Sequence, residues 1–217
     1  MFIHLLEADA NIALVNISFA IVANATYRIH DFESFQKENA MKRYHPILVI
    51  LHWALAIMII GGLIMGGFVL SETPNSDPFK MTALTAHMSM GMLILVLMIV
   101  RLMFRLFTKK PQPADIGNAM LNKSADMAHW AFYAVVIAMC ASGIAIANAA
   151  GLPAIIFGGS GEPLPANFND IPPRMAHGVI AKILGLLILS HVAAALYHQF
   201  VRKDGLLGRM WFGNRKG

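Results

Sequence analysis

Four long apolar stretches constrain the fold of this chain more than any other feature. A helix that crosses a bilayer needs about 20 mostly apolar residues, and four segments meet that requirement: residues 46–70, 84–107, 127–148 and 175–201. Of the 217 residues, 57% are hydrophobic and only 13% are charged, whereas soluble domains carry about 25% charged residues. The sequence therefore predicts an all-α protein, an integral membrane four-helix bundle forming one domain.

The connecting segments predict the orientation of this bundle. Lysine and arginine gather near the span ends that face the cytoplasm, and here they cluster before the first span, in and around the basic segment 108–126, and after the last span. The segments 71–80 and 149–173 are turn-rich and carry four acidic residues, Glu72, Asp77, Glu162 and Asp170. We expect both termini in the cytoplasm and the proline-rich segment 149–173 outside, where it either caps a site, binds a partner or only connects helices. The net charge of +5 is thus a topology signal, and nucleic acid is not an expected partner.

Residues 1–40 do not fit the plan of the bundle. The apolar part, residues 11–25, is short and contains three asparagines, and acidic residues precede it, so it makes a poor signal peptide. Met41 begins "MKRYHPILVILHW" directly before the first span. We expect 1–40 to be an extension from an upstream start codon or a poorly ordered arm, and 41–217 to be the membrane domain.

Four histidines lie inside the predicted spans, and ionisable residues at that depth are candidates for a functional site. His177 and His191 share the fourth span and are 14 residues apart, about 21 Å along a helix and about 40° around it. With alternating span directions, His52 shares the inner level with His191, and His87 shares the outer level with His177. The histidines are therefore predicted to form two pairs at two depths.

Two imidazoles from different helices at each level fit two bis-histidine b-type haems. A zinc site favours three or four ligands at one level, and a histidine hydrogen-bond relay does not require pairing by depth. The single cysteine, Cys140, excludes a disulfide and covalently attached c-type haem. Each histidine taken alone is equally well a satisfied interior residue.

Further polar residues lie at the predicted inner level. Arg101 is 14 residues from His87 on nearly the same helix face, so it is a candidate partner for haem propionates with help from Arg105; both also read as cytoplasmic anchors. His198 and His129 are candidates to give a proton to a quinone or contact a propionate, or they anchor the interface. Glycines such as Gly66 would leave room for flat macrocycles, or serve ordinary helix packing.

The chain resembles the bacterial cytochrome b561 family of four-helix di-haem proteins. The resemblance covers about residues 42–212 and rests on "LHW", "TAHMSMG", "LVLMIVRLMFR", "AHWAFY", "MAHGVIAKILGLLILSHVAAALYHQF" and "KDGLLGRM". It implies haem ligation at the matched positions His52, His87, His177 and His191, in agreement with the depth argument. The usual short N-terminus of the family has no counterpart to residues 1–40.

The expected function is single-electron transfer across the bacterial inner membrane, between a periplasmic redox partner and the quinone pool. The resemblance implies oxidation of superoxide with ubiquinone as the acceptor. Two alternatives stay open. In the first alternative, the chain is a cytochrome b subunit that anchors a periplasmic dehydrogenase or hydrogenase. In the second, it is a non-redox histidine-lined transporter or metal carrier.

Overall fold

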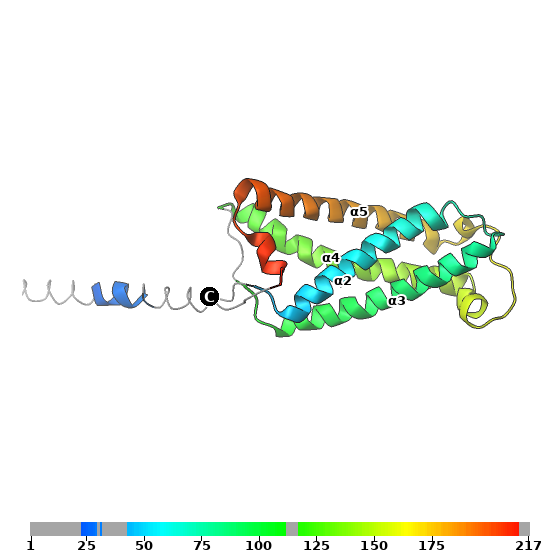
Figure 1. The fold of residues 1–217 in the computed structure, drawn as a ribbon, viewed down its shortest axis with the longest axis horizontal. Helices are drawn as coiled ribbons and strands as arrows, with labels where there is room; N and C mark the ends of the chain where they lie inside the picture. Colours follow the sequence, from blue (N-terminus) through cyan, green and yellow to red (C-terminus); the bar gives the residue numbers. More distant parts are fainter. Residues whose placement is uncertain (1–22, 30, 32–42, 112–116, 213–217) are drawn as a thin grey trace, which may run out of the picture.

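Four long helices run side by side in the computed structural model, which describes residues 23–29, 31, 43–111 and 117–212 (Figure 1). They are α2 (Pro46–Ile64), α3 (Pro78–Phe107), α4 (Ala119–Ala149) and α5 (Pro173–Tyr197). The helix α2 continues into the π-helical turn η1 (Met65–Leu70), and α5 continues into η4 (His198–Arg202). The all-helical membrane bundle predicted from the sequence is confirmed.

Two helices begin earlier than the apolar pattern predicts. Helix α3 begins at Pro78 instead of residue 84, because Asp77 caps it by accepting a hydrogen bond from the Phe79 N–H at 2.9 Å. Helix α4 begins at Ala119 instead of residue 127, and Asn118 accepts a hydrogen bond from the Met120 N–H at 3.0 Å. The prediction of a loop over residues 108–126 is therefore wrong for its second half.

Consecutive helices pack against each other, α2 on α3, α3 on α4 and α4 on α5. The core at the middle of the bundle consists of apolar side chains together with Tyr133, contributed by all four helices: Leu55, Ile94, Met98, Tyr133, Val136 and Leu184. By contrast, Cα atoms of α5 rarely approach those of α2 or α3 within the described chain. The helix α5 is thus held by α4, and side chains bridge the wider separation from α2 and α3.

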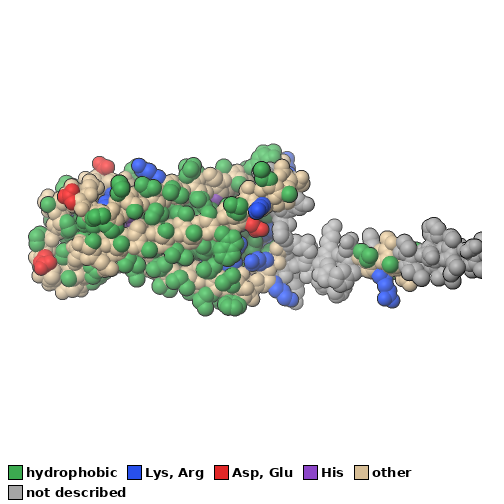
Figure 2. All heavy atoms as spheres, turned by 180° about the vertical axis from the view of Figure 1, so that it is seen from behind, with side chains coloured by type: hydrophobic (Ala, Val, Ile, Leu, Met, Phe, Trp, Pro, Cys, Tyr) green, Lys and Arg blue, Asp and Glu red, His purple; other side chains and the backbone are tan. Residues whose placement is uncertain are grey.

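The outer surface of the bundle is apolar, as a bilayer requires. Each of the four helices is long and apolar enough to cross a membrane, and large side chains such as Ile57, Phe68 and Leu189 are more than two thirds exposed. Figure 2 shows hydrophobic side chains along the sides of the molecule, with charged side chains gathered at its ends. A soluble monomer rarely exposes so continuous an apolar surface.

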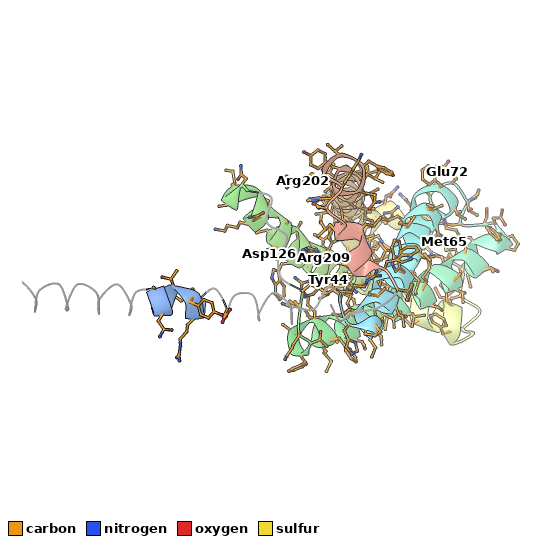
Figure 3. All side chains as sticks on the ribbon, turned by 60° about the vertical axis from the view of Figure 1, so that its left-hand side comes forward. Tyr44, Met65, Glu72, Asp126, Arg202 and Arg209 are labelled. Carbon is orange, nitrogen blue, oxygen red and sulfur yellow. The ribbon has the colours of Figure 1, made fainter. Side chains whose placement is uncertain are left out.

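The two ends of the bundle differ in charge. The end that we call the basic end holds Tyr44, Arg202 and Arg209, while Glu72 lies at the opposite end, which we call the acidic end (Figure 3). Lys109, Lys110 and Lys203 also belong to the basic end, together with the carboxylates Asp126 and Asp204, whereas Asp77, Glu162 and Asp170 belong to the acidic end.

The segment 149–173 is more ordered than the expected irregular loop. It contains the π-helical turn η2 (Pro153–Phe157) and the 3₁₀ turn η3 (Phe168–Asp170). Leu152 and Ile155 are buried with Ala147, against methionines of α3. This segment therefore covers the acidic end of the bundle. Residues 23–29 are helical with exposed side chains, and the rest of 1–40 apart from residue 31 lies outside the described residues, so the proposed extension stays a prediction.

Candidate functional site

The four intramembrane histidines meet in the two pairs that their spacing predicts. The rings of His52 on α2 and His191 on α5 have centroids 6.2 Å apart and planes at 65°, and we call them the basic-end pair. The rings of His87 on α3 and His177 on α5 have centroids 6.4 Å apart and planes at 73°, and we call them the acidic-end pair. In both pairs α5 supplies one ring across its wide separation from the facing helix.

Both separations fit two imidazoles on opposite sides of one metal ion. An imidazole nitrogen lies about 2 Å from a bound transition metal and the ring centre about 1 Å further, so the two ring centres are about 6 Å apart. Among the described residues, no group of three or more His, Cys, Asp or Glu side chains is placed to hold a metal ion. Two opposed imidazoles per level are the donor set of a bis-histidine haem.

The acidic-end pair is seated closely against neighbouring helices. The Nδ1 atom of His177 lies 2.9 Å from the Ser142 hydroxyl of α4, and a Cβ added to Gly143 would lie 3.4 Å from the His177 ring. On the other side, a Cβ added to Gly66 would lie 3.4 Å from the His87 ring. The Nδ1 atom of His87 is buried and has no hydrogen bond within the described chain.

A third histidine approaches the basic-end pair. The ring of His129 lies 6.3 Å from that of His191, and Phe132 packs edge-on against His191 at 5.3 Å. The Nδ1 atom of His129 is buried without a hydrogen bond among the residues that the structure describes. His129 therefore contacts the basic-end pair from α4, and its role as an interface anchor, a propionate partner or a proton donor to a quinone stays a prediction.

Two arginines of α3 lie close to the basic-end pair. Arg101 donates a hydrogen bond of 2.5 Å to the Leu48 carbonyl, one helical turn before His52. Arg105 is only 8% exposed, its guanidinium lies 5.6 and 5.8 Å from the ring centres of Trp130 and Tyr133, and its Nε has no hydrogen bond in the described chain. Arg105 is therefore a buried cation and not the solvent-facing anchor that its sequence position also allowed.

The C-terminal segment folds over the basic end. The indole N–H of Trp53, next to His52, donates to the Met210 carbonyl at 2.9 Å. Arg43 donates to the carbonyls of Trp211 and Phe212 at 3.3 and 2.7 Å. The 3₁₀ turn η5 (Leu206–Met210) is thereby fixed against the start of α2.

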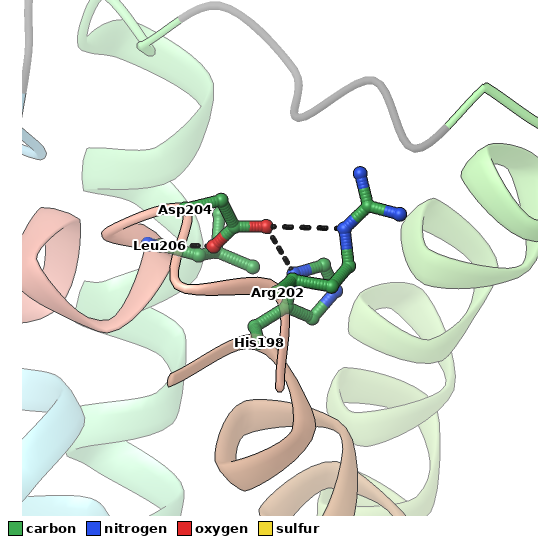
Figure 4. A network of polar contacts seen from close by, with 4 residues as sticks. All are labelled: His198, Arg202, Asp204 and Leu206. Carbon is green, nitrogen blue, oxygen red and sulfur yellow. Dashed lines mark hydrogen bonds and ion pairs between the residues drawn. The ribbon is translucent and has the colours of Figure 1, made fainter. Parts of the chain in front are cut away.

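His198 belongs to a polar network at the same end (Figure 4). Its Nδ1 lies 2.6 Å from the Asp204 carboxylate, which also accepts the Leu206 N–H at 3.1 Å and lies 3.6 Å from Arg202 Nε. Burial alone would raise the pKa of Asp204, but the hydrogen bonds from His198 and Leu206 and the nearby positive charges together hold it below its ordinary value. His198 is thus fixed by a carboxylate at the edge of the bundle.

The acidic end also holds a buried cation. Lys80 is 5% exposed and donates to the carbonyls of Leu70 and Thr73 at 2.5 and 2.7 Å, which ties the 71–77 turn to α3. Arg174, in the first turn of α5, is near enough to Lys80, His87 and His177 to act on them electrostatically. Positive charge therefore lies close to the acidic-end pair although the surrounding loops carry carboxylates.

Four membrane-spanning helices with opposed imidazoles at two levels define an integral membrane cytochrome. The model of the family "Prokaryotic cytochrome b561" matches residues 43–213. The chain belongs to this family, and it is a bacterial membrane b-type cytochrome that works in electron transfer.

Curated relatives cover nearly the same region. The chain is 28% identical to "Cytochrome b561 homolog 2" of Escherichia coli, over 79% of this chain and 93% of the relative. It is 31% identical to "Probable superoxide oxidase CybB" of Yersinia pestis, over 78% of this chain and 96% of the relative. It is also 27% identical to "Cytochrome b562" of Cereibacter sphaeroides, over 77% and 94%.

Proposed function

We propose that the protein binds two b-type haems: His52 and His191 would hold one, and His87 and His177 would hold the other. The observation that carries this proposal is the arrangement of two opposed imidazole pairs, 6.2 and 6.4 Å between ring centres, on a shared helix. The bound haems supply one-electron redox chemistry, and the protein supplies axial ligands and an apolar surrounding.

The charge division between the two ends supports an orientation in the bacterial inner membrane. Lysines and arginines favour the cytoplasmic side, so the basic end with both chain termini faces the cytoplasm and the acidic end faces the periplasm. The basic-end pair then lies on the cytoplasmic side and the acidic-end pair on the periplasmic side.

Arg101 and Arg105 are the proposed partners for the propionates of the haem at the basic-end pair. A buried cation needs a counter-charge or hydrogen bonds, and no salt bridge to Arg105 occurs within the described residues. Its Nε, which has no hydrogen bond within the described chain, and the neighbouring Tyr133 hydroxyl are donors that carboxylates would satisfy. These groups therefore favour an anionic ligand at this level.

The proposed reaction is superoxide oxidation with ubiquinone as the electron acceptor. Two superoxide anions each lose one electron and leave as dioxygen, and one ubiquinone takes both electrons and two protons to become ubiquinol. Arg174 places positive charge beside the acidic-end pair, and such a charge attracts an anion. The printed name of the Yersinia relative supports this substrate, and the His198–Asp204 pair is the proposed proton-handling group near the quinone.

The experiment is spectroscopy of the purified protein followed by stopped-flow reduction. Reduced-minus-oxidised spectra should show a b-type α-band and two haems per chain. Superoxide should reduce the haems faster than ubiquinol does, and added ubiquinone should reoxidise them. Reduction by quinol alone, with a large soluble protein co-purifying, would instead favour a subunit that anchors a periplasmic dehydrogenase or hydrogenase. A colourless protein expressed with adequate haem would contradict the cytochrome function and favour a transporter.

A further inference from the structure

Ser142 on α4 contacts two polar groups, the Met139 carbonyl and the imidazole of His177. Its hydroxyl donates to the Met139 carbonyl of the same helix at 2.8 Å. Its oxygen lies 2.9 Å from the Nδ1 atom of His177 on α5. A serine hydroxyl has one hydrogen and two lone pairs. With that hydrogen directed to Met139, the oxygen accepts from an Nδ1–H of His177, an acceptor role that the Met139 carbonyl shares.

This hydrogen bond selects one tautomer of the imidazole. When Nδ1 carries the hydrogen of a neutral histidine, the other nitrogen, Nε2, has a free lone pair. Gly143 lies beside the same edge of the ring, because a Cβ added to it would lie 3.4 Å from Cε1 and 3.8 Å from Nδ1 of His177. Ser142 and Gly143 together therefore seat the Nδ1 edge against α4, and Nε2 is the nitrogen left free for a ligand.

The facing histidine is held differently. The Nδ1 atom of His87 is buried and accepts or donates no hydrogen bond within the described chain. The acidic-end pair thus has one imidazole whose second nitrogen donates to a hydroxyl and one whose second nitrogen does not. The two histidines of this pair are therefore not equivalent in the hydrogen bonding of Nδ1.

We propose that Ser142 is a positioning residue that locks His177 in the Nδ1–H tautomer and lowers the midpoint potential of the haem at the acidic-end pair. The proposal rests on the proposed haem ligation by His87 and His177. Hydrogen-bond donation from the remote nitrogen makes an imidazole a more basic ligand, and a more basic ligand favours ferric over ferrous iron. Hydrogen bonds to the side chains that hold the haem iron are among the means by which proteins set haem potentials.

The test is redox titration of Ser142→Ala in the haem-loaded protein. Alanine has a higher helix propensity than serine, so α4 should still form. We expect one of the two midpoint potentials to rise by up to about 59 mV. The loss of one hydrogen bond changes an equilibrium constant by up to about tenfold, and for a one-electron couple a tenfold change equals about 59 mV. The same shift should occur in a His191→Ala background that retains only the haem at the acidic-end pair.

Two further variants make the result decisive. Ser142→Thr keeps the hydroxyl and should restore the wild-type potential and the ferric electron paramagnetic resonance spectrum. Ser124→Ala is the matched control, because Ser124 makes the same kind of bond to a carbonyl of α4, at 2.8 Å to Met120, without contacting a histidine. Loss of the haem at this pair in Ser142→Ala, restored by Ser142→Thr, also supports the proposal.

Two results would overturn the role of Ser142. One is a wild-type potential and wild-type haem retention in Ser142→Ala, and the other is a shift that Ser142→Thr fails to reverse. Because haem content is measured in the same samples, these results differ from failure of the proposed function, in which the wild-type protein itself binds no haem.

Discussion

The imidazole ring of His191 lies at nearly equal distances from two other histidine rings, 6.2 Å from His52 and 6.3 Å from His129. Separation alone therefore does not decide which of the two shares a haem with His191. The motif "LHW" and the pairing by depth favour His52, and the variants below separate the two possibilities.

We expect His191→Ala and His52→Ala each to reduce the haem content from the proposed two per chain to one, because each removes one of the two proposed ligands. His129→Ala should keep two haems. Pyridine haemochrome quantification against protein mass measures this, with His45→Ala as a control, which alters the cap of α2 and a ring contact with Phe104. Retention of two haems in His52→Ala together with a loss in His129→Ala would assign the ligand role to His129.

Replacement of the buried cation Arg105 tests the anionic partner at the basic end. In Arg105→Met, loss of a positive charge near the haem should favour the ferric state, so one of the two midpoint potentials should fall. A redox titration monitored by absorbance measures this change. Lys110→Met removes an exposed charge at the same end and should leave both potentials within error. An unchanged potential in Arg105→Met would argue against a nearby propionate.

The turn around Asp204 should have a specific pH dependence. Because the folded protein lowers the pKa of this carboxyl, its stabilising contribution is complete above its unfolded value of about 3.8. It is lost as the pH falls through the lower folded value. Thermal unfolding should therefore show a constant difference between wild type and Asp204→Asn from pH 5 to 8, which vanishes in stronger acid. A difference that grows toward alkaline pH would contradict this assignment.

Lys80 should matter for stability more than an exposed lysine. Lys80→Ala leaves the partly buried carbonyls of Leu70 and Thr73 without this donor, and the cost approaches about 1 kcal/mol for each group, the lower end of the range for a buried unsatisfied group. We expect a clear decrease in the unfolding temperature in detergent, whereas Lys123→Ala, at an exposed position of α4, should have little effect. Equal effects of the two substitutions would show that the two hydrogen bonds of Lys80 contribute little.

The number of spans and the pairing of the histidines were predictable because both depend on patterns along single helices. Apolar length gives the spans, and the 14-residue step between His177 and His191 gives two levels on one face. The start of α4 was missed because Asn122, Lys123 and Asp126 are too polar for a membrane span, although they continue the helix. The pair Asn118 and Ala119 carried a usable capping signal.

The contacts of Ser142 could not be predicted from the sequence. They depend on the rotation of α4 relative to α5, and each helix is apolar on nearly every side, so periodicity does not fix this rotation. The contact between Trp53 and the Met210 carbonyl, 157 residues apart, likewise leaves no local pattern. Burial of Arg105 follows from the positions of Trp130 and Tyr133 on a neighbouring helix, which a single span does not specify.

The hydrogen bonds from Arg43 to Trp211 and Phe212 also set the order in which the molecule can be completed. Arg43 precedes the first span, and its acceptors lie beyond the last one. During synthesis the basic end therefore stays uncovered until nearly the whole chain has left the ribosome. The neighbourhood of His52 is closed only as a final step of assembly, after the four helices are in place.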